Sequence, residues 1–170
     1  MNGINTSDSD NGNIISEIGT ILYKGKLPMP VENFIKVTSK YGYRTPVYNS
    51  NGIQISGGKK HEGIDLVGNL GSRIINVEDG IVSYAGWQEG YGNCVEIKHI
   101  DESGNVFYTF YAHMRENSIC VQTGQKIVTG QIIGVQGSTG NSSGDHLHFE
   151  IRLENKKTID PTPYLFNEKK

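Results

Sequence analysis

The sequence predicts an all-β, mainly antiparallel protein with little helix. Glycine accounts for 22 of the 170 residues, about twice its usual share, while there are only five prolines. From position 52 onward, glycines recur between short stretches in which apolar and polar residues alternate, a pattern typical of strands joined by turns. We find no amphipathic helical pattern longer than about three turns. These features favour a turn-rich β domain over a helical, collagen-like or disordered chain.

The chain divides into three parts. Residues 1–27 begin with a stretch rich in asparagine, serine, aspartate and glycine and end in a linker, so we expect a flexible leader. Within this leader, residues 14–22 are expected to form one short element of undetermined type. Residues 28–166 are the expected folded domain, and residues 167–170 a short tail. A domain of this length can bury a core without disulfide or metal staples.

Charge and hydropathy argue against several classes of partner. The 16 basic and 18 acidic residues nearly balance, for a formal net charge of −2, and no basic stripe indicates nucleic acid or an anionic membrane. No apolar run approaches the roughly 18 residues that span a bilayer, and the start of the chain lacks the basic and then apolar pattern of a signal peptide. We expect a monomer with no nucleic-acid partner and no membrane segment.

The two cysteines, Cys94 and Cys120, lie far apart in the sequence and show no C-x-x-C spacing. This arrangement favours two small apolar strand residues over a disulfide or a redox pair. Neither cysteine has the sequence surroundings of a metal ligand.

The alternation of apolar and polar residues predicts a β-hairpin near the middle of the chain. Cys94 to Ile100 and Val106 to His113 flank a polar turn and form its two arms. Because side chains alternate between the two faces of a strand, we expect Thr109, Tyr111 and His113 on one face of the second arm.

A third strand is predicted from His146 to Leu153. Its apolar side chains all point one way, toward a core: Leu147, Phe149, Ile151 and Leu153. The opposite face presents His146, His148 and Glu150 to a common space.

Four of the five histidines lie in two short motifs or at the end of the second hairpin arm: His61, His113, His146 and His148. The pair His146 and His148 suits two metal ligands, or one ligand beside a catalytic group, although an isolated H-x-H pair is more often two surface imidazoles. His61 and Asp65 stand in a glycine-rich stretch that favours a strand or loop over a helix, and imidazole nitrogen and carboxylate oxygen are both zinc ligands. His99 shares the apolar face of its strand, so we interpret it as a half-buried structural histidine.

Such a cluster of histidines suits hydrolytic zinc chemistry. Three protein ligands leave zinc a fourth position for water, which is the arrangement of catalytic rather than structural sites. Zinc lowers the pKa of that water toward about 7 and polarises a substrate carbonyl. Amide hydrolysis also needs a base for the water and a donor for the developing oxyanion, and histidines beyond the ligands are candidates for both roles.

The segments around these residues resemble the lysostaphin and LytM type of zinc endopeptidase, which hydrolyses the peptides of bacterial peptidoglycan. The resemblance covers roughly residues 28–166 and rests on five segments in the family's order: Thr38–Arg44, His61–Asp65, Tyr111–Met114, Gly137–Asn141 and His146–Glu150. It implies a β-sandwich-like peptidase domain whose site lies at the floor of a narrow groove, with residues 137–144 forming one wall.

Matched position by position, the resemblance implies one zinc ion, with a water in its open position, on three ligands: His61, Asp65 and His148. His146 would be the general base. His113, with Tyr111 beside it on the same face, would polarise the carbonyl or hold the oxyanion, although the roles of His113 and His146 could be exchanged.

The resemblance also implies a partner and a location. The partner is a peptidoglycan peptide, and the location is the cell wall or the extracellular space. With no export signal of its own, the chain would reach that location as part of a longer secreted or anchored protein or by another route.

Two other functions fit parts of the sequence. The fold also serves in non-catalytic relatives that act as cell-wall binding or scaffold modules, but these typically lose metal ligands, and all three ligand positions are filled here. Asp79–Val82 and Gly124–Gln131 are similar to half-motifs of biotinyl and lipoyl carrier domains, but the lysine that such domains need at a hairpin tip is missing.

Overall fold

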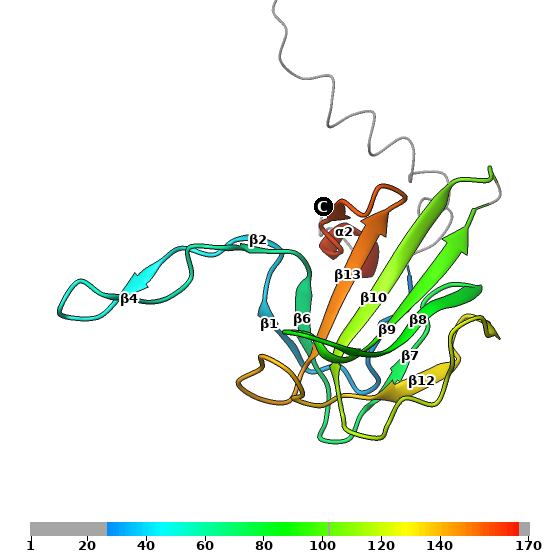
Figure 1. Ribbon diagram of the computed structural model, residues 1–170, viewed down its shortest axis with the longest axis horizontal. Helices are drawn as coiled ribbons and strands as arrows, with labels where there is room; N and C mark the ends of the chain where they lie inside the picture. The colour runs from blue at the N-terminus through cyan, green and yellow to red at the C-terminus, as the bar shows by residue number, and fades with distance from the viewer. Residues whose placement is uncertain (1–26, 102, 167–170) are drawn as a thin grey trace, which may run out of the picture.

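The computed structural model describes residues 27–101 and 103–166, whose regular secondary structure is almost entirely antiparallel β-strand (Figure 1). Seven strands of the largest sheet follow the order β1 (Lys36–Ser39), β6 (Ile64–Val67), β13 (Leu147–Leu153), β10 (Val106–Met114), β9 (Gly92–Ile100), β8 (Gly80–Gln88) and β11 (Lys126–Ile127). An eighth strand, β14 (Thr158–Ile159), pairs with β13. The predicted all-β, mainly antiparallel class is confirmed.

Smaller elements surround this sheet. The paired strands are β7 (Arg73–Ile75) with β12 (Ile132–Val135), β2 (Gly42–Tyr43) with β5 (Lys60–His61), and β3 (Val47–Tyr48) with β4 (Gln54–Ser56). The helix α2 (Thr162–Leu165) has only four residues. Among the residues that the structure describes, no helix has the length and apolar character needed to cross a bilayer.

The predicted hairpin and third strand are present. Strands β9 and β10 form the hairpin, with Val106 opposite Ile100 across a turn in which the Asp101 carboxylate accepts main-chain hydrogen bonds. Strand β13 begins one residue later than predicted, because the main chain of His146 pairs with Gly137 outside the large sheet.

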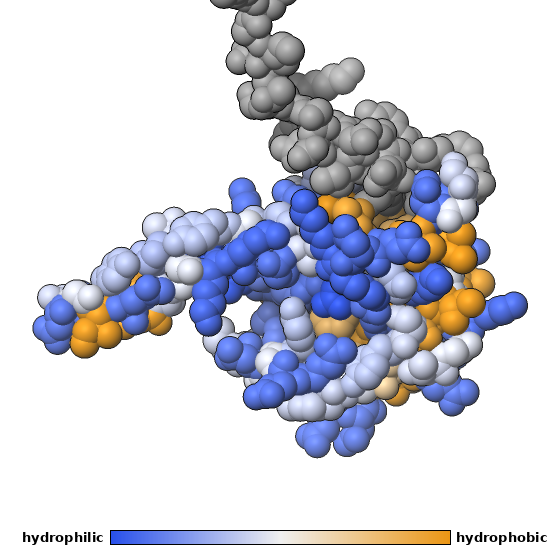
Figure 2. Space-filling model, turned by 45° about the horizontal axis from the view of Figure 1, so that its top comes forward, coloured by the Kyte–Doolittle hydropathy of each residue, from blue (hydrophilic) through white to orange (hydrophobic). Residues whose placement is uncertain are grey.

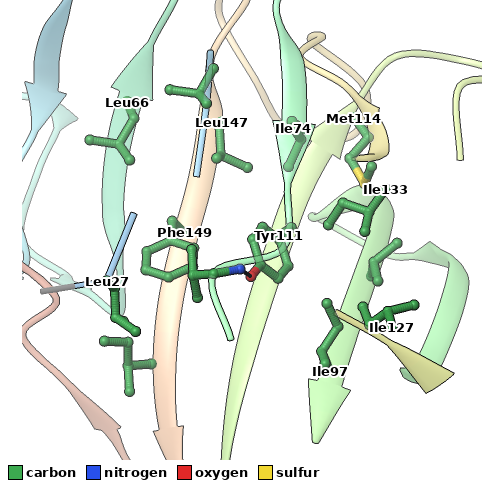
Figure 3. Close-up of a cluster of buried hydrophobic side chains, with 14 of the residues drawn as sticks. Leu27, Leu66, Ile74, Ile97, Tyr111, Met114, Ile127, Ile133, Leu147 and Phe149 are labelled. Carbon is green, nitrogen blue, oxygen red and sulfur yellow. Dashed lines mark hydrogen bonds between the residues drawn. The ribbon is translucent and has the colours of Figure 1, made fainter. Parts of the chain in front are cut away.

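The hydrophobic core lies on one face of the large sheet. The apolar side chains of β13 are fully buried there, as the alternation predicts: Leu147, Phe149 and Ile151. Figure 3 shows this face in contact with side chains from neighbouring strands, including Leu66, Tyr111, Ile74 and Ile133. Burying one such side chain stabilises a protein by roughly 1.5–3 kcal/mol, so this face stabilises the sheet. The opposite face carries the polar side chains of β13 beside a smaller apolar cluster of Cys94, Phe110 and Ala112.

The boundary of the folded domain differs slightly from the prediction. Leu27, expected at the end of the leader, is 6% exposed, packs in the core and donates its main-chain N–H to the Tyr164 carbonyl at 3.1 Å. The rest of the predicted leader, with its short element at 14–22, and the predicted tail lie outside the described residues.

His99 is more deeply buried than predicted. Its ring is fully buried and stacks on Phe107 with centroids 4.7 Å apart. Nδ1 donates to the Asp79 carbonyl at 2.9 Å, and Nε2 lies 2.8 Å from the Thr109 hydroxyl. Both ring nitrogens have hydrogen-bond partners inside the core, which agrees with a structural role for His99. The prediction that this histidine is only half-buried is wrong.

The cysteines are both free, but only one is a buried strand residue. Cys94 is fully buried in β9, and burial raises its pKa to about 12, so its thiol stays protonated. Cys120 is exposed and lies outside the strands, so the prediction for this residue is wrong.

One hairpin projects from the body of the protein. It contains β3 and β4 and carries apolar surface toward its free end (Figures 1 and 2). At its base, Arg44 exchanges main-chain hydrogen bonds with Lys59 and Gly58, and the chain then enters β5. The hairpin therefore leads directly into His61.

Burial of His99 should make stability depend on pH. Burial lowers the pKa of this residue from 6.5 to about 4, so the unfolded chain binds a proton that the folded protein excludes. The resulting stabilisation is complete above about pH 6.5 and is lost as the pH falls toward 4, by about 2 kcal/mol between pH 7 and pH 5. We expect urea unfolding at these two pH values to show a smaller loss in His99→Gln, whose side chain does not titrate. An equal loss in both proteins would contradict this assignment.

Candidate metal centre

Three side chains, two from the polar face of the large sheet and one from β5 beside it, bring one possible ligand atom each to a common point. His61 Nε2 and Asp65 Oδ1 are 3.1 Å apart, His148 Nδ1 and Asp65 Oδ1 are 2.9 Å apart, and the two nitrogens are 3.1 Å apart. Tetrahedral ligands at about 2.0–2.2 Å from zinc are separated by about 3.4 Å. The triangle therefore needs to expand only slightly to hold a zinc-sized ion.

Hydrogen bonds outside the triangle fix the ring protons. His61 Nδ1 lies 2.8 Å from the Lys40 carbonyl oxygen, and His148 Nε2 lies 2.8 Å from the Glu150 carboxylate. Both partners only accept hydrogen bonds, so these nitrogens carry the protons and a neutral ring turns its lone pair toward Asp65. Three acceptor atoms facing one another repel unless a cation lies among them. This donor set of two imidazoles and one carboxylate fits zinc.

The pKa shifts of Asp65 and His148 also indicate a site that fits a cation. Burial alone would raise the pKa of Asp65 and lower that of His148, but the hydrogen bonds that join them outweigh burial. The pKa of Asp65 is therefore well below its usual range, and that of His148 is raised with a further contribution from Glu150. The ionised Asp65 gives the centre a buried negative charge, which either a proton on His148 or a metal cation can neutralise.

Strand pairing brings these distant segments together. Asp65 in β6 lies directly opposite His148 in β13, and His61 is held in β5. Gly63 lies between His61 and Asp65 in the sequence, and a Cβ atom at this position would lie 2.4 Å from the Phe149 carbonyl oxygen. Only glycine allows the chain to approach β13 this closely.

Two further imidazoles flank the triangle. The rings of His113 and His146 have centroids 4.8 Å apart, and His146 Nε2 is 3.7 Å from Asp65 Oδ1. His113 Nδ1 donates to the Thr139 carbonyl and His146 Nδ1 to the Gly144 carbonyl, both at 2.8 Å. In a neutral ring this leaves Nε2 with the lone pair. Burial lowers the pKa of His113 to about 4, which keeps that ring neutral near pH 7.

A loop contact fixes the carbonyl that orients His113. The Thr139 hydroxyl donates to the Met114 carbonyl at 2.6 Å and accepts the Asn93 N–H at 3.0 Å. Next to it, Gly140 has φ +73°, and a Cβ atom there would lie 2.4 Å from the main-chain nitrogen of Gly92. The loop thus packs backbone to backbone against the start of β9.

A β-bulge turns His113 toward the triangle. The register of β10 with β9 shifts between Tyr111 and Met114, and His113 has φ +59°. An extra residue in one strand breaks the alternation of faces. His113 and Tyr111 therefore do not share a face, contrary to the sequence-based prediction.

The role predicted for Tyr111 is accordingly wrong. Its side chain is fully buried in the core, with its ring centroid 5.3 Å from that of Phe149. Its hydroxyl accepts the Val77 N–H at 3.2 Å and lies 3.0 Å from the Thr109 hydroxyl. Tyr111 supports the sheet beneath the site and is not among the residues that line the groove around the triangle.

An open polar groove surrounds the triangle, and several of its lining residues had no assigned role: Arg44, Lys60, Glu62 and Tyr91. Arg44 Nη2 lies 3.1 Å from Asp65 Oδ2 and so holds the carboxylate oxygen that faces away from the histidines. Arg44 and Glu150 both stand in segments that carried the family resemblance, whereas nothing in the sequence singled out Tyr91. Residues 141–143 line the side where a wall was expected.

Known proteins with similar sequences include both an enzyme and an activator. The chain is 32% identical over 159 residues to the peptidoglycan DD-endopeptidase ShyC of Vibrio cholerae, covering 90% of this chain and 34% of that protein. It is 44% identical over 110 residues to the murein hydrolase activator NlpD of Escherichia coli, covering 64% of this chain and 26% of that protein. The chain spans about a quarter to a third of the length of the curated relatives it matches.

Structural comparison and family assignment agree with the predicted resemblance. The catalytic domain of the antimicrobial peptidase lysostaphin from Staphylococcus simulans matches with a TM-score of 0.61 and 31% identity, covering 76% of this chain and 90% of that chain. The sequence pattern of peptidase family M23 matches residues 59–161, more than half of the chain and the part that contains the triangle and both flanking histidines. This chain belongs to peptidase family M23.

Proposed function

We propose that this protein is a zinc-dependent endopeptidase that hydrolyses peptide bonds in the stem or cross-bridge peptides of peptidoglycan. The observation that carries the proposal is the convergence of three acceptor atoms, from His61, Asp65 and His148, beside two further imidazoles at the floor of an open groove. The similarity of the chain to the peptidoglycan DD-endopeptidase ShyC supports peptidoglycan peptides as the substrate. The expected place of action is the cell wall.

The three ligands would hold one zinc ion, which supplies a water of lowered pKa and polarises the scissile carbonyl. We assign His146 as the general base, because its Nε2 lies 3.7 Å from Asp65 Oδ1, at the edge of the triangle. It takes a proton from the attacking water and gives it to the leaving amine as the carbon–nitrogen bond breaks. The Gly144 carbonyl, by accepting from Nδ1, keeps this ring in the required tautomer.

His113 is assigned to the developing oxyanion. Its neutral ring accepts at Nε2, so it becomes a donor to the oxyanion only after it takes a second proton there from solvent in the open groove, an uptake that the negative charge of the developing oxyanion favours. The exchange of roles between His113 and His146 stays an alternative within the same site. Arg44 contributes by orienting the Asp65 carboxylate, since its Nη2 lies 3.1 Å from Asp65 Oδ2.

Ligand and catalytic roles can be separated by substitution. We expect His148→Ala to lose both bound zinc and activity, because one of three ligands is removed. His113→Ala should keep stoichiometric zinc and lose turnover by about 10²–10⁴-fold, since it removes proton or oxyanion chemistry but no ligand. Zinc content by atomic absorption and hydrolysis rates on purified peptidoglycan measure the two effects. Normal turnover in His113→Ala would contradict the role assigned to His113.

The bond that is cut can be identified from the products. Digestion of purified peptidoglycans with different cross-bridges should release fragments with new amino termini inside the peptides and no new reducing sugars, as mass spectrometry and a reducing-end assay will show. Removing the metal with a chelator should abolish hydrolysis, and stoichiometric zinc should restore it. New reducing ends would show glycan cleavage and overturn the endopeptidase proposal.

Similarity to NlpD makes an activator the second candidate function. A pure activator has no need of the triangle or of the two oriented imidazoles, because a scaffold contributes a surface and no chemistry. Purified protein that binds little zinc and leaves peptidoglycan intact on its own, yet stimulates a separate wall hydrolase, would favour this alternative over the enzyme.

A further inference from the structure

Glu150 is a fully buried carboxylate on the polar face of β13, and the chemistry proposed above does not use it. It lies two residues beyond His148, and its Oε1 accepts the His148 Nε2 proton at 2.8 Å. We propose that Glu150, held in place by Arg152, is a positioning residue that fixes the tautomer and orientation of His148, so that Nδ1 is the atom offered to the metal. This inference rests on the proposed metal centre but on no assumption about substrate.

The hydrogen bond decides which nitrogen binds the metal. An ionised carboxylate only accepts hydrogen bonds, so the proton of a neutral His148 ring must stay on Nε2. Nδ1 is then left with its lone pair directed at Asp65 Oδ1, 2.9 Å away, and at His61 Nε2, 3.1 Å away. A carboxylate behind a metal-binding imidazole also makes the imidazole a stronger ligand.

Glu150 is itself firmly held. Arg152 Nε donates to Glu150 Oε2 at 2.6 Å, and the Tyr91 hydroxyl donates to Oε1 at 3.2 Å. The Arg152 guanidinium stacks 3.8 Å above the Phe110 ring and also donates to Glu96 Oε2 at 2.8 Å. A buried carboxylate is costly unless its charge is paired, and here each oxygen has a donor.

Strand geometry explains how hydrogen bonds connect His148, through Glu150 and Arg152, to Glu96 on β9. Residues two apart on a strand share a face, so His148, Glu150 and Arg152 line up along β13. Phe110 of β10 lies opposite Glu150 on one side and opposite Glu96 of β9 on the other. Arg152 therefore crosses over Phe110 to join two carboxylates, and only one of them contacts His148.

This difference between the two carboxylates provides a matched pair of variants. In Glu150→Gln the side chain has one acceptor oxygen and one amide NH₂ group, so the NH₂ must face either the His148 Nε2 proton or the Arg152 Nε proton. Either arrangement sets two donors against each other. In Glu96→Gln the same conflict arises with Arg152 or Lys156, but no ligand of the metal is touched.

We expect Glu150→Gln to bind zinc about 10–100-fold more weakly than the wild type, and Glu96→Gln to bind it as the wild type does. Competition with a chromophoric chelator measures the zinc dissociation constants, and thermal unfolding of the zinc-free proteins shows that each variant is folded. The inference is overturned if Glu150→Gln keeps wild-type affinity, or if Glu96→Gln loses as much as Glu150→Gln. A wild-type protein that bound no zinc would overturn the proposed function as well.

Nitrogen-15 NMR of the zinc-loaded wild type tests the tautomer without any substitution. We expect the His148 ring to show a protonated Nε2 and a metal-bound Nδ1. A protonated Nδ1 with zinc on Nε2 would overturn the inference, even if Glu150→Gln failed to fold.

Discussion

The pairing register between β6 and β13 is the constraint on which the proposed metal centre depends. It places Asp65 opposite His148, so a carboxylate and an imidazole 83 residues apart in sequence meet at 2.9 Å. A slip of one residue would turn every side chain of β13 to the other face, moving His148 into the core and Phe149 toward solvent. The same alternation that builds the core therefore also sets the ligand geometry, and one cannot be lost without the other.

Main-chain carbonyls in loops and strand ends orient most of the imidazoles. Each accepts an Nδ1 proton and so determines which nitrogen faces the groove; the pairs are Lys40 with His61, Thr139 with His113, and Gly144 with His146. A carbonyl cannot donate, so the tautomer in a neutral ring follows directly from the fold. His148 differs, because its outer nitrogen meets the carboxylate of Glu150 and its inner nitrogen is Nδ1.

Membership in family M23 fits both an enzyme and an activator, since the relatives include ShyC and NlpD. Fold alone does not choose between them. The proposal of an enzyme rests on the site, where an ionised carboxylate, two inward lone pairs and two oriented imidazoles form the arrangement that metal-assisted hydrolysis would use.

The sequence by itself determined the fold class, the β9–β10 hairpin, the core face of β13 and the segments that carry the proposed ligands, because alternation and glycine punctuation are local properties of the chain. Only the tertiary structure decided the place of Tyr111. The bulge that separates it from His113 depends on the Tyr91 carbonyl, which accepts the His113 N–H at 2.9 Å from another strand end. It likewise decided that Arg44 contacts Asp65 and that Glu150 contacts His148, because hydrogen-bond partners across a sheet are set by packing and register, which no local pattern of residues encodes.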